Sequence, residues 1–148
     1  MIIKQFQLAK IINPKLFQSF LIYGPNEGLV RENIDILYNT YTDDSGCEKL
    51  YITNKQLDED PTVLQNEINS ISMFSSKKFI TLDSLKEKHS IIIEDCLSGN
   101  YENIFLIVKL DNLNKSSKIR KIYETSNDHY ALACYEDDIK VTSSLLEG

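Results

Sequence analysis

Residues 23–33 read YGPNEGLVREN, and this stretch decides the fold. The apolar run FLIY (20–23) leads into it, and a segment with helical spacing of apolar residues follows it. A buried strand, a glycine-containing turn and an amphipathic helix, in that order, are typical of the start of a parallel α/β sheet. Nucleotide-binding proteins hold phosphates at this kind of turn, so its residues are the first candidates for a site.

The turn has the shape of a phosphate-binding loop but not its chemistry. Such a loop reads G-x-x-x-x-G-K-[ST], in which the Lys reaches the phosphates and the hydroxyl holds Mg²⁺. With Gly24 as the first glycine, the second glycine, the Lys and the Ser/Thr fall on Leu29, Val30 and Arg31, and Gly28 comes one position early. We therefore expect a tight strand-to-helix turn that binds no nucleotide and no other cofactor.

Four further apolar runs are rich in Ile, Val, Phe, Tyr or Leu. They are KLYIT (49–53), KFITLDS (78–84), NIFLIVKLDNL (103–113) and HYALACYED (129–137). Segments with helical spacing separate them, at 28–41, 60–74, 89–99 and 116–126. This alternation predicts an α/β fold with a parallel β-sheet flanked by helices on both faces. With its degenerate loop, the arrangement looks like a P-loop ATPase domain whose chemistry is absent.

The helical segments also predict which residues face the core. The first is expected to bury Leu29, Ile34, Leu37 and Tyr41. The second is expected to begin with Asp60 as N-cap and Pro61 in its first turn, and to bury Leu64, Ile68 and Ile71. The third and fourth are expected to bury Ile92, Ile93 and Cys96, and Ile119, Ile122 and Tyr123, with Ser116 or Ser117 as the cap of the fourth.

The bulk composition narrows the function classes. The chain has 148 residues, which is long enough for one domain. Its net charge of −6 argues against a protein whose whole surface binds nucleic acid. Three scattered cysteines without CxxC spacing argue against disulfides or a zinc site and fit a cytoplasmic protein. No run predicts a signal peptide or a membrane span. A new amphipathic pattern begins just before residue 148, as expected of a short closing helix or of a longer protein.

Candidate catalytic residues are few. ATPases of this topology place an Asp-Glu pair after a later strand, but here Asp83 is followed by Ser84 and Asp111 by Asn112. His89 and His129 have no partners at metal-ligand spacing. We therefore predict no catalytic residue, no metal site and no enzymatic activity of the chain's own.

Taken together, these segments resemble the N-terminal domain of the delta subunit of bacterial DNA polymerase III, part of the clamp loader. The resemblance covers residue 17 to the end and is carried by residues 20–38, 60–84, 104–124 and 133–138. It implies a RecA-like domain of the P-loop/AAA+ type over residues 1–148 of a longer protein, with the lid and collar domains absent. It also implies a role in DNA replication as a subunit of a DNA-directed DNA polymerase, a transferase at the level of the assembly.

The resemblance further implies a binding site for the β sliding clamp. In this family the contact lies where a helix ends in a short hydrophobic pair, which here corresponds to Ile71, Ser72, Met73 and Phe74. Met73 stands where the family usually has Leu, a swap of nearly equal volume. From the residues alone, a core residue that closes the helix end is the better reading of Phe74, and the resemblance reverses this preference. ATP hydrolysis would be carried out by other clamp-loader subunits, which this protein would contact through the absent C-terminal part.

Two other functions remain open at this stage. One is a small nucleotide-binding enzyme with a variant loop, against which the missing Lys and Ser/Thr argue. The other is an inert scaffold that joins an assembly through another part of the protein. Contact with DNA is expected to be indirect or weak: Lys115, Lys118, Arg120 and Lys121 cluster near one helix start but fit a solvated face better.

Overall fold

The structure is a computed structural model and describes residues 1–13, 15–42, 47–70, 77–111 and 117–135. A five-stranded parallel sheet has the order β2-β3-β4-β1-β5. Its strands are β1 (Gln18–Tyr23), β2 (Glu48–Thr53), β3 (Lys78–Asp83), β4 (Ile104–Leu110) and β5 (Tyr130–Ala133). The predicted parallel α/β fold is confirmed, and each of the five apolar runs contains a strand.

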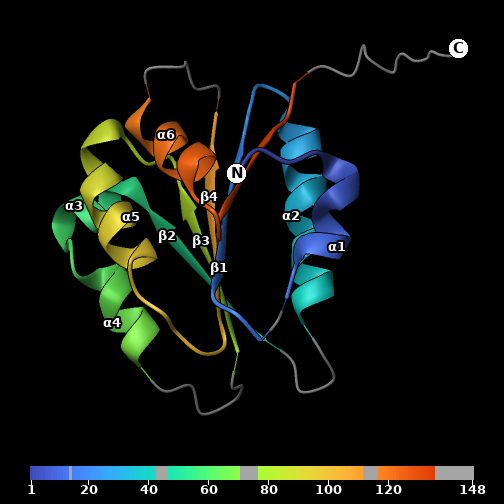
Figure 1. The fold of residues 1–148 in the computed structure, drawn as a ribbon. Helices are drawn as coiled ribbons and strands as arrows, with labels where there is room; N and C mark the ends of the chain where they lie inside the picture. The colour runs from blue at the N-terminus through green and yellow to red at the C-terminus, as the bar shows by residue number, and fades with distance from the viewer. Residues whose placement is uncertain (14, 43–46, 71–76, 112–116, 136–148) are drawn as a thin grey trace, which may run out of the picture.

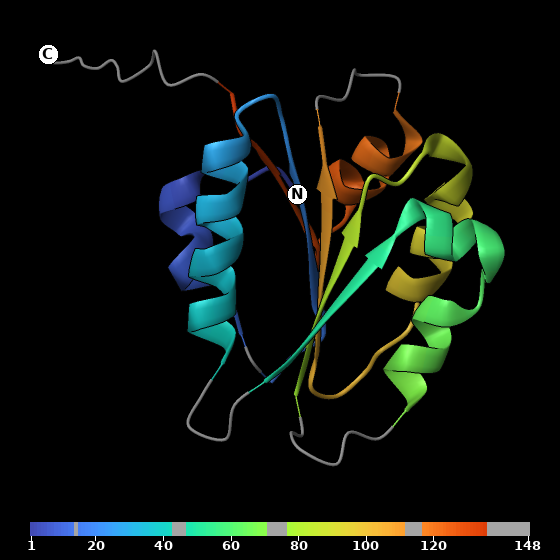
Figure 2. The same cartoon turned by 180° about the vertical axis from the view of Figure 1, so that it is seen from behind.

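Helices cover both faces of this sheet (Figures 1 and 2). On one face lie α1 (Leu8–Ile11) and α2 (Glu27–Tyr41), preceded by a 3₁₀ turn at Gln5–Gln7. On the other face lie α3 (Asn54–Glu59), α4 (Val63–Asn69), α5 (Ser90–Leu97) and α6 (Lys118–Thr125), with a 3₁₀ turn at Glu87–His89. Among the described residues, none of these helices has the length and apolar character needed to cross a bilayer.

The core on the α2 face contains a row of aromatic rings. Phe79 and Phe105 stack with their ring centroids 5.2 Å apart, and Phe105 stacks on Phe20 at 5.3 Å. These three side chains come from β3, β4 and β1 and are at most 1% exposed. Tyr41, at the end of α2, lies 5.0 Å from the Phe105 ring. Ring packing of this kind ties three neighbouring strands to the helix that covers them.

The residues that α2 buries differ from the prediction. Leu37 and Tyr41 are buried as expected, but Val30 and Asn33 fill the other inward positions, and Leu29 and Ile34 are only partly buried. Asn33 is completely buried and donates from its side-chain amide to the Cys134 sulfur at 3.3 Å. A polar side chain with a partner in the next layer is therefore part of the core, which apolar periodicity could not indicate.

The helix predicted over 60–74 is also shorter than expected. Asp60 does not cap it: its carboxylate accepts from the Thr62 amide and hydroxyl, at 3.0 and 2.6 Å, and closes a turn before α4. Thr62 is the N-cap residue, and α4 ends at Asn69. Leu64 and Ile68 are buried as predicted, whereas Ile71 lies outside the described residues.

The predictions for the later helices, α5 and α6, are largely confirmed. Ile93, Cys96, Ile119 and Tyr123 are buried, and Ile92 and Ile122 are partly buried. Ser117 is the N-cap of α6.

Candidate functional site

The turn between β1 and α2 depends on Gly24. Gly24 has a φ of +137°, and a Cβ at this position would lie 2.1 Å from the Cys134 carbonyl oxygen. The Gly24 amide donates to the Asp111 carbonyl at 3.1 Å. The glycine is therefore needed where the turn passes close to the backbone that follows β5.

The first turn of α2 is already capped from within the chain. The Asn26 side-chain oxygen accepts from the Leu29 amide at 3.1 Å, and the Asn26 side-chain nitrogen donates to the Tyr135 carbonyl at 3.3 Å. In a phosphate-binding loop the free amides of this turn would point at the ligand. Here one of these amides, that of Leu29, already donates to Asn26. An Asn just before a helix is a common N-cap, so this contact could be expected from the sequence.

The positions that would carry the phosphate chemistry are filled differently. Val30, which occupies the Lys position, is 2% exposed and packs in the core under α2. A hollow of about 220 Å³ lies beside it, at the carboxyl ends of the strands. Its charged lining residues are Glu27, Asp83, Lys109 and Asp111. The ammonium of Lys109 lies 3.8 Å from the Asp83 carboxylate, so three carboxylates face one already paired cation. This charge balance disfavours a triphosphate.

We expect Mg-ATP to leave the melting temperature of the chain unchanged. A ligand present at 100 times its Kd adds about 2.7 kcal/mol to the free energy of unfolding, and that would raise the midpoint by several degrees. Thermal melting with and without ATP at about 5 mM therefore detects any Kd below about 50 µM. A rise with ATP that is absent with sulfate of matched ionic strength would contradict this reading of the turn.

The residues predicted to bind the clamp, Ile71, Ser72, Met73 and Phe74, lie outside the described residues. Both ends of the segment that contains them are described. Before it, α4 ends at Asn69, and Ser70 is its C-cap. After it, β3 begins at Lys78.

Lys78 joins these two ends. Its ammonium donates to the carbonyls of Glu67 and Ser70, at 2.5 and 2.8 Å, and to the Ser70 hydroxyl at 2.5 Å. Lys78 is only 4% exposed. A cation that satisfies the last carbonyls of a helix also interacts favourably with the negative end of the helix dipole. Nothing in the sequence indicated this role, because the lysine is simply the first residue of an apolar strand.

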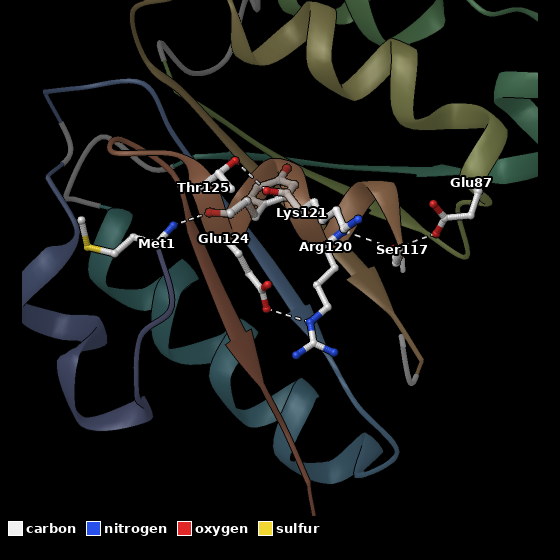
Figure 3. Close-up of polar contacts among 8 residues, drawn as sticks. Met1, Glu87, Ser117, Arg120, Lys121, Glu124 and Thr125 are labelled. Carbon is white, nitrogen blue, oxygen red and sulfur yellow. Dashed lines mark hydrogen bonds and ion pairs between the residues drawn. The ribbon is translucent and has the colours of Figure 1, made fainter. Parts of the chain in front are cut away.

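The basic helix start that was considered for DNA is α6 (Figure 3). Glu87 accepts from the Ser117 hydroxyl at 2.7 Å and from the Lys118 amide at 2.6 Å, while the Ser117 oxygen accepts from the Arg120 amide. Arg120 pairs with Glu124 at 2.7 Å, and its guanidinium lies 5.5 Å from the centroid of the Tyr23 ring. A carboxylate therefore occupies the end of α6 at which a phosphate would bind.

The side chains of this cluster differ in exposure. Lys118 and Lys121 are exposed, Arg120 is partly buried, and Lys115 lies outside the described residues.

Both histidines have structural contacts. His89 accepts from the Lys86 amide at 2.9 Å, and its other ring nitrogen lies 2.9 Å from the Asp58 carboxylate. His129 accepts from the Ser19 amide through Nδ1 at 3.0 Å. Within the described part of the chain, no three His, Cys, Asp or Glu side chains are arranged to hold a metal ion.

The stability of the chain is expected to fall in mild acid because of His129. Burial lowers the pKa of His129 in the folded state, and protonation would remove the acceptor for the Ser19 amide. The unfolded chain, whose histidine pKa is about 6.5, then binds the proton more readily. The contribution is complete above that pH and is lost as the pH falls from there through the folded pKa.

Denaturant unfolding between about pH 7.5 and pH 5 measures this effect. His129→Asn keeps an acceptor near Nδ1 but cannot titrate, so its stability should fall less over this range than that of the wild type. His89 is present in both proteins and cancels in the comparison. Equal slopes for the two proteins would show that His129 does not contribute.

The described geometry defines a class of protein: an α/β domain built on a parallel sheet, with a glycine turn after β1 whose phosphate-binding side chains are replaced. The family model for "DNA polymerase III, delta subunit" matches residues 20–131. The chain therefore belongs to the DNA polymerase III delta subunit family, and the resemblance drawn from the sequence is confirmed. It is also similar to the "Probable DNA polymerase III subunit delta" of Rickettsia prowazekii (strain Madrid E), with 25% identity over 135 residues.

That alignment covers 89% of the chain and 39% of the relative. The chain thus spans about two fifths of the length of the curated relative it matches.

Proposed function

We propose that the chain is the clamp-binding domain of a clamp-loader delta subunit, which binds the ring-shaped β sliding clamp during DNA replication. The observation that carries the proposal is the match to the delta-subunit family over residues 20–131. The contact is assigned to Met73 and Phe74 with their neighbours Ile71 and Ser72. An aromatic side chain next to a flexible thioether suits a concave apolar pocket on a partner protein.

The anchoring of this segment supports the assignment. Lys78 fixes the end of α4 to the start of β3 through three hydrogen bonds. The two described ends on either side of residues 71–76 are therefore tied to each other by the buried Lys78. Anchoring of this kind lowers the conformational entropy that a short binding segment loses when it meets its partner.

The proposed mechanism is a shift in the shape of the clamp. Binding near one interface of the ring favours a clamp conformation that does not fit the closed ring, so the interface opens or stays open. The shift cannot exceed the difference between the affinities of the domain for the two clamp shapes. ATP binding and hydrolysis are assigned to other subunits, in keeping with the buried Val30 at the Lys position.

The remaining contacts are proposed to lie elsewhere. The relative is more than twice as long as the region it shares with this chain. We assign residues 1–148 to one AAA+-like N-terminal domain and place the contacts with other clamp-loader subunits in parts of the protein beyond it. DNA contact by this domain is weak or indirect, since Glu87 already holds the amide end of α6.

The test is calorimetric binding of the chain to purified β clamp from the same organism. Met73→Ala/Phe74→Ala should weaken binding at least about 100-fold, because burying each side chain contributes roughly 1.5–3 kcal/mol. Phe6→Ala/Ile91→Ala is the matched control. It removes two apolar side chains that are 75% and 72% exposed, and it should bind like the wild type.

Melting curves must show that both variants fold. Undiminished binding by the folded Met73/Phe74 variant would remove the contact from this segment. Failure of the wild type to bind at concentrations well above micromolar would overturn the proposal for this domain.

A further inference from the structure

A hollow on the α2 face of the sheet takes no part in the function proposed above. It has a volume of about 230 Å³ and lies between α2 and the strands β2 and β3. Tyr51, Phe79 and Thr81 contribute apolar and hydroxyl groups to it from the strands, and Ile34 lines it from α2. The register pairs Lys49 with Phe79 and Tyr51 with Thr81, so these side chains form two adjacent rows.

Among the described residues, the charged groups that line the hollow are all cations. They are Arg31 from α2, Lys49 from β2 and Lys109 from β4. In a chain with 22 acidic and 16 basic residues, a described lining with three cations and no carboxylate is unusual. The nearest acidic partner is Asp83, which accepts from the Tyr51 hydroxyl and pairs with Lys109 at 3.8 Å.

Arg31 and Lys49 have no carboxylate partner among the described residues. Arg31 is exposed. The Lys49 ammonium lies 4.1 Å from the centroid of the Tyr38 ring, and Tyr38 in turn packs edge-on against Phe79 at 5.2 Å. The cation–π contact holds Lys49 beside the hollow without neutralising its charge.

The strand beside this hollow is an edge of the sheet. β2 pairs with β3 on one side and is the last strand in the sheet order on the other. Figure 2 shows β2 at the margin of the sheet, next to β3. Tyr51 is 54% exposed, and Lys49 is exposed as well. A strand edge next to a side-chain pocket is the arrangement by which sheets bind extended peptides: the main chain adds to the edge, and alternate side chains enter the pocket.

We propose that this edge and hollow form a docking site for an extended acidic segment of a partner protein, with one apolar residue entering the hollow and flanking carboxylates meeting Arg31 and Lys49. The volume supports a side chain rather than a whole small molecule, since ligand pockets usually measure about 300–1,000 Å³. The cations supply the charge complementarity, and the edge of β2 that pairs with no described strand supplies main-chain partners. The site is separate from residues 71–74 and does not depend on clamp binding.

The probe is a fluorescein-labelled peptide pool, Glu-Asp-Xaa-Asp-Glu, in which Xaa is Leu, Ile, Phe or Tyr. Five extended residues span about 17 Å, close to the length of β2. Fluorescence polarisation should give saturable binding to the chain, and raised salt should weaken it. Replacing the flanking acids by Gln and Asn, or Xaa by Ser, should each weaken binding at least about tenfold.

Charge reversal tests the location. Arg31→Glu/Lys49→Glu should weaken binding of the pool at least about tenfold, whereas Lys10→Glu/Lys15→Glu, which changes the net charge equally at exposed lysines elsewhere, should not. N-methylation of alternate peptide amides should abolish binding in one of the two possible patterns and spare it in the other, as expected for strand addition. Melting curves should show that both charge variants fold.

Three results would overturn the proposal. One is the absence of saturation up to about 1 mM peptide, which corresponds to only about 4 kcal/mol of binding. Another is equal weakening by both charge-reversal variants, which would indicate non-specific attraction. The last is displacement of the peptides by an oligothymidylate at the same concentration, which would assign the hollow to phosphates instead.

Discussion

Gly24→Ala is expected to lower the free energy of unfolding by about 3 kcal/mol or more. The new methyl group would lie 2.1 Å from the Cys134 oxygen and 2.6 Å from its carbonyl carbon, and the φ of +137° is one that L residues rarely adopt. The neighbouring backbone cannot easily withdraw. The Cys134 amide donates to the Tyr23 carbonyl at 2.6 Å, and the Cys134 carbonyl accepts from Asn26 at 3.3 Å. Urea unfolding followed by circular dichroism measures the loss.

Gly28→Ala is the matched control. A Cβ on Gly28 would meet only the Asn26 side-chain oxygen, at an ordinary distance of 3.6 Å. Because Gly28 lies in the first turn of α2, alanine should leave stability unchanged or raise it by up to about 1 kcal/mol. The two glycines of the turn would then behave oppositely, as expected if Gly24 serves packing against β5 and neither serves phosphate. Equal effects of the two substitutions would contradict this account.

Lys78→Met is expected to cost about 2–3 kcal/mol of stability. Methionine keeps most of the buried aliphatic chain but removes the charged donor that the carbonyls of Glu67 and Ser70 now share. Hydrogen bonds that involve a charged group contribute about 1.5–3 kcal/mol to stability, more than neutral ones. Hydrogen exchange should show the loss of protection concentrated in α4, and denaturant unfolding gives the global value.

Lys88→Met provides the comparison for Lys78. Lys88 pairs with Asp58 at 3.1 Å, but unlike Lys78 its side chain is largely exposed, at 62%. Exposed pairs contribute about 0–1 kcal/mol, so this substitution should have little effect. If Lys78→Met proved as mild as Lys88→Met, the buried ammonium would not be what holds the end of α4.

The strands were predictable because their signal is local. Each apolar run is continuous enough to identify a strand, although β2 is only partly buried, and the alternation with helical spacing then predicts a parallel sheet. The short helix α3 was missed although its start was readable. Thr53 accepts from the Gln56 amide while Gln56 reaches back to the Thr53 amide, a capping box written as T-x-x-Q.

The errors of orientation have a different cause. Apolar periodicity places Leu29 and Ile34 on the buried face of α2, but the structure turns Val30 and Asn33 inward. The deciding contact is between Asn33 and Cys134, which are 101 residues apart in the sequence. The three hydrogen bonds of Lys78 to the end of α4 could not be predicted from the sequence either, since they depend on where β3 lies relative to that helix. The loss of the phosphate-binding Lys and Ser/Thr after β1 was predictable, because it follows from the identity of the residues at those positions and from nothing in the tertiary structure.

The order of the strands also bears on how the chain folds while it is being made. β1 lies between β4 and β5, and β5 is the last of the described strands in the sequence. One of the two neighbours of β1 is therefore synthesised after all the other described strands. Until residue 133 has left the ribosome, one whole edge of β1 has no neighbour, and residues 1–3 lack the partner with which the Ile3 amide bonds Ala131 at 3.0 Å. We expect nascent chains that stop short of β5 to stay open to proteases and chaperones, and the sheet to close in one late step.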